Sequence, residues 1–322
     1  MNKIGILSSG SDAPGMNACI RAAVRAALLN DLEIVGIRRG YAGLIHGEIE
    51  ALDRRVIANI IHQGGTIIGT ACSEEFRTVE GRAKAIQVLQ QAKIDGLILI
   101  GGDGTFQGGT VLSQECGVSI IGVPGTIDND VFGTDYSIGF DTAINTALQA
   151  IDRIRDTALS HDRLFFVEVM GRHTGFIALE VGIAGGAEEL LIPESPMSIE
   201  ELCEHLVKAF KGDKKSATVV VTEAEQPGES FNIAQKVKEK AGLESRVCIL
   251  GHIQRGGCPT ARDRVLATRL GFAAVLALLD GRTGQMVGEI KGEIAFTPLR
   301  DTWEKDKPLN KDLASLAKSL CA

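Results

Sequence analysis

Short apolar runs alternate with helical patterns along the chain. Strand-like runs include "KIGILSS" near the N-terminus, followed later by "DGLILIGGDG" and "VSIIGVPGTIDND". Helical segments such as "MNACIRAAVRAALLN" lie between them. Strands that alternate with helices are typical of parallel sheets covered by helices. The pattern therefore predicts an α/β fold with mainly parallel sheets.

The strand and helix pattern forms two series, and the second begins near residue 140. It opens with the long helical segment "FDTAINTALQAIDRIRDTALS" and continues with the strands "RLFFVEVMGR", "SATVVVTE" and "RVCILGHIQRGG". No low-complexity linker separates the two series. We therefore expect two similar three-layer α/β domains, with the chain crossing between them through ordered structure.

Polar and charged residues follow several of the apolar strands directly. In open α/β sheets, ligands bind in the crevice beyond the carboxyl ends of the strands. The coincidence of five such segments predicts a ligand site. These segments are Gly102-Asp103-Gly104, Thr126-Ile127-Asp128, Met170-Gly171-Arg172, Glu223 and His252.

Composition and charge narrow the class of protein. The 322 residues are 44% hydrophobic and 23% charged, which is ordinary for a globular protein. The net charge of −7 argues against a nucleic-acid or membrane-surface binder. The seven cysteines show no C-x-x-C pair, which suits a reducing compartment. With no signal peptide or membrane span evident, we expect a soluble, cytoplasmic protein.

The segment "GGDGTFQGG", residues 101–109, follows a strand and opens a helix. Its glycines would let backbone amides approach phosphate oxygens at a helix N-terminus. The spacing misses the dinucleotide fingerprint, and the chain contains no G-K-[ST] of a Walker loop. Asp103 would repel a bare phosphate, which suggests a magnesium partner. The alternative is a simple helix cap in a tight turn.

The segment "PGTIDND" places a hydroxyl, Thr126, and two carboxylates, Asp128 and Asp130, in one loop. One of these carboxylates could accept a hydroxyl proton during phosphoryl transfer. An Asx-turn in a surface loop is the alternative.

Arginines recur in the loops of this acidic chain. "GHIQRGG" contains His252 and Arg255, with Arg246 upstream, while "MGRHTG" and "SHDR" add Arg172 and Arg163. Several arginines at strand ends favour an anionic substrate. Arg21 and Arg25 lie one helical turn apart, which fits either a solvated helix face or a second anion site.

Taken together and in this order, these motifs resemble the ATP-dependent 6-phosphofructokinase family of bacteria. The resemblance runs from "KIGILSSGSDAPGMNACIR" through "PGTIDND" to "LGHIQRGGCPTARDRVLATRLG" and covers essentially the whole chain. It implies an ATP/Mg-binding domain of residues 1–138 plus 253–305 and a fructose 6-phosphate-binding domain of residues 139–252 plus 306–322. The active site would lie in the cleft between the two domains.

The resemblance also implies roles for individual residues. Asp128 would be the base that takes the proton from the C1 hydroxyl of fructose 6-phosphate, with Thr126 and Arg172 as further catalytic residues. Asp103 would bind Mg²⁺. The ATP-binding set would be Ser11, Cys72, Ser73, Gly102, Asp103, Gly104 and Thr105. The sugar-phosphate set would be Thr126, Ile127, Asp128, Arg163, Met170, Gly171, Arg172, Glu223, Arg246, His252, Ile253, Gln254 and Arg255.

Some of these residues would act across subunits. Arg163 and Arg246 would reach the sugar 6-phosphate from a neighbouring subunit of a homotetramer. An effector site for ADP or phosphoenolpyruvate would lie at a subunit interface, although Asn59 and Ser216 replace residues common there. The effector set would be Arg21, Arg25, Arg54, Arg55, Asn59, Arg155, Gly186, Ala187, Glu188, Lys211, Lys214, Lys215 and Ser216.

Four positions bear on the phosphoryl donor and on activity. Gly104 and Gly125 stand where pyrophosphate-using relatives carry Asp and Lys, which favours ATP. Ser11 replaces a family glycine beside the nucleotide phosphates, and Cys72 replaces an arginine. We therefore expect a working 6-phosphofructokinase, with Ser11 and Cys72 as the positions that would reduce its activity. A weakened paralogue that binds sugar phosphate or nucleotide and regulates a partner is the alternative, and a pyrophosphate-dependent enzyme is disfavoured.

Overall fold

The structure, a computed structural model, describes residues 1–161, 163–211 and 216–320. The chain forms two compact units. Unit 1 comprises Met1–Thr142 and Arg255–Lys307, and unit 2 comprises Ala143–Gln254 and Pro308–Ala322. The sequence predicted that the chain crosses between the two domains after residues 138, 252 and 305. The roles of the two domains in binding nucleotide and sugar stay predictions.

Unit 1 contains a seven-stranded sheet in the order β11-β10-β5-β4-β1-β2-β3. The bounds are β1 Lys3–Ser8, β2 Glu33–Ile37, β3 Ile49–Ala51, β4 Gly96–Gly101, β5 Ser119–Pro124, β10 Gln285–Ile290 and β11 Glu293–Pro298. The inner strands pair in parallel, and only β3 and β11 run antiparallel to their neighbours. The inner strands are buried on both faces, which explains why they are nearly continuous apolar runs in the sequence.

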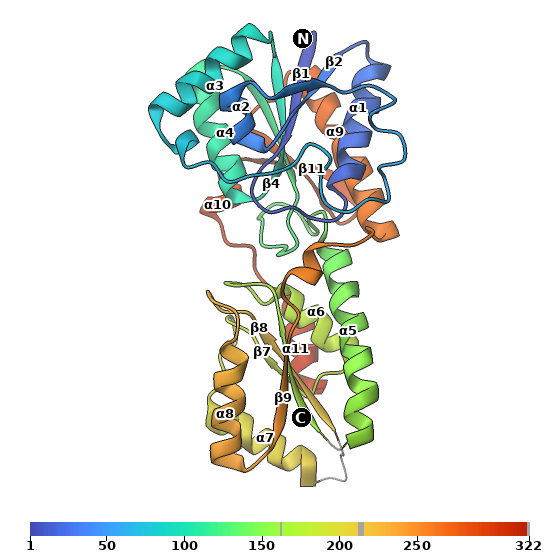
Figure 1. Ribbon diagram of the computed structural model, residues 1–322, viewed down its shortest axis with the longest axis vertical. Coiled ribbons are helices and arrows are strands. Elements are labelled where there is room, and N and C mark those ends of the chain that lie inside the picture. Colours follow the sequence, from blue (N-terminus) through green and yellow to red (C-terminus); the bar gives the residue numbers. More distant parts are fainter. Residues whose placement is uncertain (162, 212–215, 321–322) are drawn as a thin grey trace. The chain divides into compact units, whose positions relative to one another are not determined.

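Helices cover both faces of this sheet. Figure 1 shows α1 (Met16–Leu29) beside α9 (Ala261–Leu279) on one face, with α2 (Gly40–His46), α3 (Val79–Gln91) and α4 (Asp103–Cys116) on the other. The close approach of α9 to α1 depends on Gly271, because a Cβ there would lie 2.5 Å from the Cys19 carbonyl oxygen. The core under α2, α3 and α4 includes Leu7, Leu99 and Phe106.

Unit 2 contains a four-stranded, wholly parallel sheet in the order β7-β8-β6-β9. The strands are β6 Leu164–Val169, β7 Glu189–Leu191, β8 Ala217–Thr222 and β9 Ser245–Ile249. In Figure 1, α7 (Ile199–Lys211) and α8 (Glu229–Ala241) lie on one side of the sheet, and α5 (Phe140–His161), α6 (Phe176–Gly185) and α11 (Lys311–Leu320) on the other. Phe166, Leu206 and Val219 belong to the core beneath α7.

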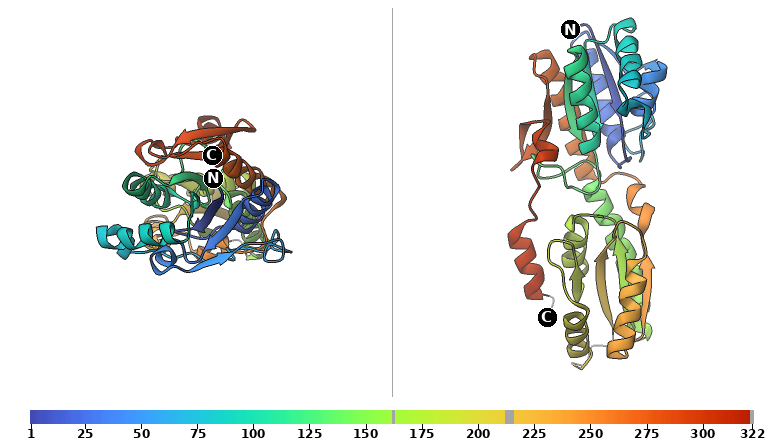
Figure 2. Two further views of the ribbon diagram at one scale, coloured as in Figure 1. Left: turned by 90° about the horizontal axis from the view of Figure 1, so that it is seen from above. Right: turned by 90° about the vertical axis from the view of Figure 1, so that its left-hand side faces the viewer.

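The predicted α/β class is confirmed, but the sequence did not reveal several edge elements. β3 and β7 have only three residues each, which is too short for a periodicity signal. β10 and β11 form a hairpin whose two loop residues, Lys291 and Gly292, both have positive φ. Figure 2 shows this hairpin, in orange and red, at the edge of the sheet of unit 1. No described helix has the length and apolar character that a membrane span requires.

A buried carboxylate joins two distant segments of unit 1. Asp263, near the start of α9, is 1% exposed. It accepts hydrogen bonds from the Gly139 amide at 2.9 Å, the Thr142 amide at 2.8 Å and the Thr142 hydroxyl at 2.5 Å. The first amides of a helix have no partner within the helix, so Asp263 supplies one at the start of α5. Burial nevertheless raises the pKa of Asp263 to about 6.

Replacing this carboxylate should destabilise unit 1. In Asp263→Ala, three buried donors lose their acceptor, and we expect the free energy of unfolding to fall by about 3 kcal/mol. The urea midpoint of the full chain, followed by circular dichroism, measures this change. Asp280→Ala at the exposed other end of α9 is the matched control. Equal midpoints for the two variants would contradict the structural role of Asp263.

Candidate active site

Three polar loops of unit 1 meet at one edge of its sheet. They follow β1, β4 and β5, which are neighbours with parallel register. Together with the segment around residues 72–77, the loops enclose a cavity of about 720 Å³. The cavity is lined by most of the residues that the sequence assigned to ATP and to catalysis. These are Ser11, Cys72, Ser73, Gly102, Asp103, Gly104, Thr105, Thr126 and Asp128.

The strand order explains why the cavity forms here. The chain continues from β1 to β2 on one side, whereas β4 pairs with β1 on the other. Loops that leave adjacent strands in opposite directions open a crevice at such a switch point. The loop after β1 and the start of α4 border this crevice, so the position of the cavity follows from the topology.

Glycines let the loop after β4 pack closely against its neighbours, and they leave space on the side that faces the cavity. A Cβ at Gly101 would lie 2.6 Å from the Ser9 carbonyl oxygen, to which Thr105 Oγ1 donates a hydrogen bond of 2.9 Å. In contrast, a Cβ at Gly102 or Gly104 would meet no atom within 4 Å. These two glycines therefore border open space at the N-terminus of α4, where an anion is favoured.

Asp103 has the features of an unsatisfied ligand. Its Oδ1 is buried without a hydrogen-bond partner. Burial, and then the nearby charge of Asp130, raises the pKa of Asp103 to about 7. A divalent cation would satisfy the orphaned oxygen and favour the ionised form, so the residue fits magnesium. Among the described residues, no three His, Cys, Asp or Glu side chains gather as a metal site, so further ligands would come from phosphates and water.

The loop after β5 holds its two functional candidates in a defined turn. The Asp128 amide donates to Thr126 Oγ1 at 3.2 Å, and Ser137 Oγ donates to the Thr126 carbonyl at 2.7 Å. Asn129 adopts a left-handed conformation, with φ of 55°. Ile127 was predicted to contact the substrate, but its side chain is buried and does not line the cavity.

The segment that carries Cys72 forms one wall of the cavity. Cys72 is exposed, whereas Ser73 Oγ accepts the Phe76 amide at 3.2 Å. Phe76 stacks on Tyr41 with ring centroids 4.0 Å apart, and both rings line the cavity. The sequence did not single out Tyr41.

Two arginines that the sequence did not single out also line this cavity. Arg82 forms an ion pair with Glu115 at 2.8 Å. Arg77 is highly exposed and lies 3.5 Å from Glu74. Their only sequence signal was two basic residues five positions apart, one that ends the stretch "GTACSEEFR" and one that follows it.

Unit 2 has its own group of polar residues at the carboxyl ends of adjacent strands. Arg172 follows β6, Glu223 follows β8 and His252 follows β9. The Glu223 amide donates to the Val169 carbonyl at 2.7 Å, which extends the strand pairing into the loops. The predicted sugar-binding residues of this unit, Met170 included, therefore begin at a common sheet edge.

Three of these side chains interact electrostatically. Glu223 is 5% exposed, and burial followed by the charge of Glu168 raises its pKa. Arg172 and His252 oppose this shift, so both lie close enough to act on the carboxylate. Glu168 is itself held by the Gly228 amide at 2.7 Å and by Ser230, whose amide and hydroxyl donate at 3.1 and 2.5 Å.

The backbone at Gly171 and Arg172 adopts unusual conformations. Gly171 has φ of 150°, and a Cβ there would lie 2.5 Å from the Thr174 carbonyl oxygen. Arg172 has φ of 49°, which is uncommon for a residue with a side chain. Strained positions of this kind are concentrated at functional sites, and here the strain aims the arginine that acts on Glu223.

Other predicted sugar-phosphate residues lie elsewhere. Arg163 precedes β6, and Arg246 pairs with Phe165 near the start of β9, so both occupy the amino end of the sheet. That end is about 20 Å from the carboxyl ends. Arg255 belongs to unit 1, where it forms an ion pair with Asp12 at 2.5 Å.

Two further residues of the predicted sugar-phosphate set directly precede Arg255. Ile253 is 57% exposed, and Gln254 donates to the Gly251 carbonyl at 3.1 Å.

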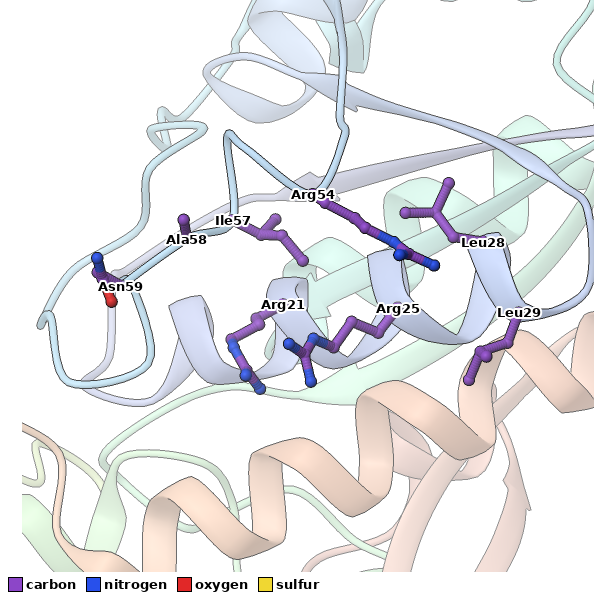
Figure 3. A pocket seen from close by; sticks show the side chains of 8 residues that line it. All are labelled: Arg21, Arg25, Leu28, Leu29, Arg54, Ile57, Ala58 and Asn59. Atoms are coloured by element: carbon purple, nitrogen blue, oxygen red, sulfur yellow. The ribbon is translucent and has the colours of Figure 1, made fainter.

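Four predicted effector residues, three of them arginines, line a separate cavity of about 490 Å³ in unit 1. Arg21 and Arg25 come from α1, and Arg54 reaches in from the loop above (Figure 3). Burial and the neighbouring Arg25 lower the pKa of Arg21. Within the described parts of the chain, no carboxylate forms an ion pair with any of the three. Asn59 also lines the cavity, whereas Arg55 does not.

The remaining predicted effector residues belong to unit 2. Arg155 donates to the Gly185 and Gly186 carbonyls at the end of α6. Glu188 accepts the Thr218 amide at 2.7 Å. Ala187 is buried, Lys211 ends α7, and Ser216 precedes β8. Lys214 and Lys215 lie outside the described residues.

The chain is similar to known phosphofructokinases along nearly its whole length. The phosphofructokinase family model matches residues 3–278. The chain is 57% identical over 320 residues to ATP-dependent 6-phosphofructokinase 1 of Thermus thermophilus, covering 99% of both chains. It is 52% identical over 321 residues to ATP-dependent 6-phosphofructokinase of Cytophaga hutchinsonii, covering 99% of this chain and 98% of that one.

Comparison with solved structures agrees. The structure of phosphofructokinase from Saccharomyces cerevisiae matches with a TM-score of 0.89 and 34% identity. All of this chain is covered, but it spans only 47% of the yeast chain. Because the family match and these identities extend over most of its residues, the chain belongs to the phosphofructokinase family.

Proposed function

We propose that this protein is an ATP-dependent 6-phosphofructokinase, which transfers the γ-phosphoryl group of MgATP to the C1 hydroxyl of fructose 6-phosphate. The products are fructose 1,6-bisphosphate and ADP. One observation supports this most strongly: Asp103, Asp128 and the glycines of the phosphate loop line a single cavity. The names of the bacterial relatives supply the substrates.

In this proposal Asp128 is the general base. It accepts the proton of the C1 hydroxyl as the hydroxyl oxygen attacks the γ-phosphorus. Thr126 holds the Asp128 amide and so sets the position of the carboxylate. Magnesium held by Asp103 would neutralise charge on the phosphoryl oxygens.

The surroundings of two glycines favour ATP over pyrophosphate as the donor. Gly104 borders open space that a larger nucleotide can use. At Gly125, a Cβ would lie 2.8 Å from Ile100 and 3.0 Å from Met16, so a lysine would require these core side chains to move. The chain therefore lacks room for a cation that would compensate a smaller donor.

We assign the sugar to Met170, Gly171, Arg172, Glu223 and His252. Arg163 and Arg246 lie at the other end of the sheet, so they would serve the site of a second subunit. This supports a homotetramer with shared sites. Ile253, Gln254 and Arg255 stay as proposed contacts near the sugar phosphate.

We also propose that the cavity formed by Arg21, Arg25 and Arg54 binds an anionic effector, ADP or phosphoenolpyruvate. Its three guanidinium groups have no ion-pair partner among the described residues, which supports an anion there. The unit 2 part of the effector set would come from a neighbouring subunit. As an enzyme of glycolysis, the protein would work in the cytoplasm with magnesium.

The first test compares donors and removes the base. The wild-type chain should turn over fructose 6-phosphate with MgATP and not with pyrophosphate. In Asp128→Asn, kcat should fall by a factor of about 10² to 10⁴ because the proton acceptor is lost, while the KM for the sugar changes little. Asp280→Asn serves as the control. Sugar-phosphate binding without turnover by either donor in the wild type would contradict the proposal.

The second test addresses position 72. In Cys72→Arg, a cation enters the cavity wall, and we expect kcat to rise about tenfold because the charge of the transferring group is better stabilised. The KM for ATP should change less. Cys258→Arg places the same charge at an exposed cysteine that does not line this cavity. An unchanged or lower kcat in Cys72→Arg would show that another cation already fills this role.

The third test uses pH. Asp103, with its pKa of about 7, must be ionised to bind magnesium, so the apparent KM for Mg²⁺ should rise as the pH falls below 7. Removing a neighbouring negative charge lowers the pKa of a carboxyl group. Asp130→Asn should therefore move the inflection to lower pH, whatever its effect on the absolute KM. An inflection that stays in place would contradict the coupling of Asp103 to Asp130.

A further inference from the structure

A cavity in unit 2 is lined by residues of β7, α6, α7 and α11, and it shares Ile192, Pro196 and Met197 with the cavity that Arg172 and Glu223 line. Its volume is about 370 Å³, within the range of small-molecule sites. Most of its wall is apolar, with Leu179 from α6 and Met197 from the loop after β7. Helix α11 closes one side with Ala317, which is 5% exposed.

A buried carboxylate lies in the wall of this cavity. Glu189, at the start of β7, is only 4% exposed. Its Oε1 is 2.6 Å from His205 Nδ1, on α7. No described residue donates a hydrogen bond to its Oε2, which is also absent from the fully buried unpaired oxygens of the described chain. This oxygen is therefore accessible from the cavity.

The bond to His205 compensates only part of the cost of burying the Glu189 carboxylate. Burial raises the pKa of Glu189 even though the bond to His205 opposes the shift. A desolvated carboxylate with one free oxygen gains strongly from an added charged donor. Apolar walls around a single such group define a ligand with an apolar body and one cationic end.

The other charged groups on the wall do not supply this donor. Glu201 is negative, and its carboxylate accepts the Ser198 amide at 2.9 Å and the Ser198 hydroxyl at 2.8 Å. Lys318, on the exposed side of α11, forms no ion pair with a described residue. Apart from His205, the charged side chains on the wall are Glu189, Glu201 and Lys318, whose net charge of −1 favours a cationic ligand.

We propose that this cavity is a binding site for a small apolar molecule that carries one protonated amine, with the ammonium group bound to Glu189. The bound molecule would contact α6, α7, the loop after β7 and α11 together. Ligand binding to the folded state stabilises it, so the amine should also raise the thermal midpoint of the protein. The proposed amine site does not depend on the kinase activity proposed above.

The test uses three probes with the same phenylbutyl body and the full chain. We expect 4-phenylbutylamine to bind in calorimetric titration at least tenfold more tightly than 4-phenylbutanol, because only the amine makes a charge-assisted hydrogen bond. 4-Phenylbutyrate should bind most weakly. Equal affinities for the amine and the carboxylate, or no saturable binding of any probe, would overturn the proposal.

Variants locate the binding. Glu189→Gln should weaken amine binding about tenfold and leave the alcohol unchanged, whereas Glu204→Gln, on the exposed side of α7, should change neither. Ala317→Leu fills the cavity and should weaken both probes, which also tests the site if Glu189→Gln does not fold. Unchanged amine binding in both Glu189→Gln and Ala317→Leu would place the amine elsewhere and overturn the proposal.

Discussion

In both sheets, parallel strands pair so that their carboxyl ends share one edge. The neighbours β5, β4 and β1 do so in unit 1, and β8, β6 and β9 in unit 2. Most loops that carry a candidate for phosphate, sugar or proton chemistry begin at one of these edges, whereas the segment of Cys72 and Ser73 follows the antiparallel β3. The register therefore fixes which residues can act together, and it also separates Arg163 and Arg246 from the others. The residue types in the loops would not by themselves bring these side chains to one edge of a sheet.

The buried carboxylates differ in the number of donors that they receive, and this difference separates structural from ligand-binding roles. Asp263 and Glu168 each accept three hydrogen bonds and connect segments distant in the sequence. Glu189 accepts one, and the buried Oδ1 of Asp103 accepts none from the described residues. Since an unsatisfied buried charge destabilises the fold, its persistence is best explained by a ligand that satisfies it. By this criterion Asp103, Glu189 and Glu223, whose carboxylate accepts no hydrogen bond from a described residue, are the carboxylates that a ligand would satisfy.

The sequence predicted the parts of the molecule that follow from local patterns. The inner strands were visible because burial on both faces requires continuous apolar runs, and the phosphate loop because its run of glycines stands between a strand and a helix in the sequence. The three-residue strands and the β10–β11 hairpin have no comparable signal. The partners Asp12 of Arg255 and Glu115 of Arg82 also escaped prediction, because a long-range ion pair leaves no trace in sequence spacing. Tyr41 is placed by stacking on Phe76 and by the hydrogen bond that its hydroxyl donates to the Thr105 carbonyl at 2.5 Å.

The wall of the 720 Å³ cavity in unit 1 shows how the chain could tolerate cysteine at position 72. Arg82, whose side chain is 13% exposed, pairs with Glu115 and donates to the Arg77 carbonyl at 2.8 Å, so moving it towards a ligand would break these contacts. Arg77 has a different environment, because its pairing with Glu74 spans 3.5 Å and both side chains are about 80% exposed. An exposed pair of this kind contributes at most about 1 kcal/mol. Arg77 can therefore turn into the cavity at little cost when a triphosphate is bound. It is the residue best placed to supply part of the positive charge that Cys72 does not.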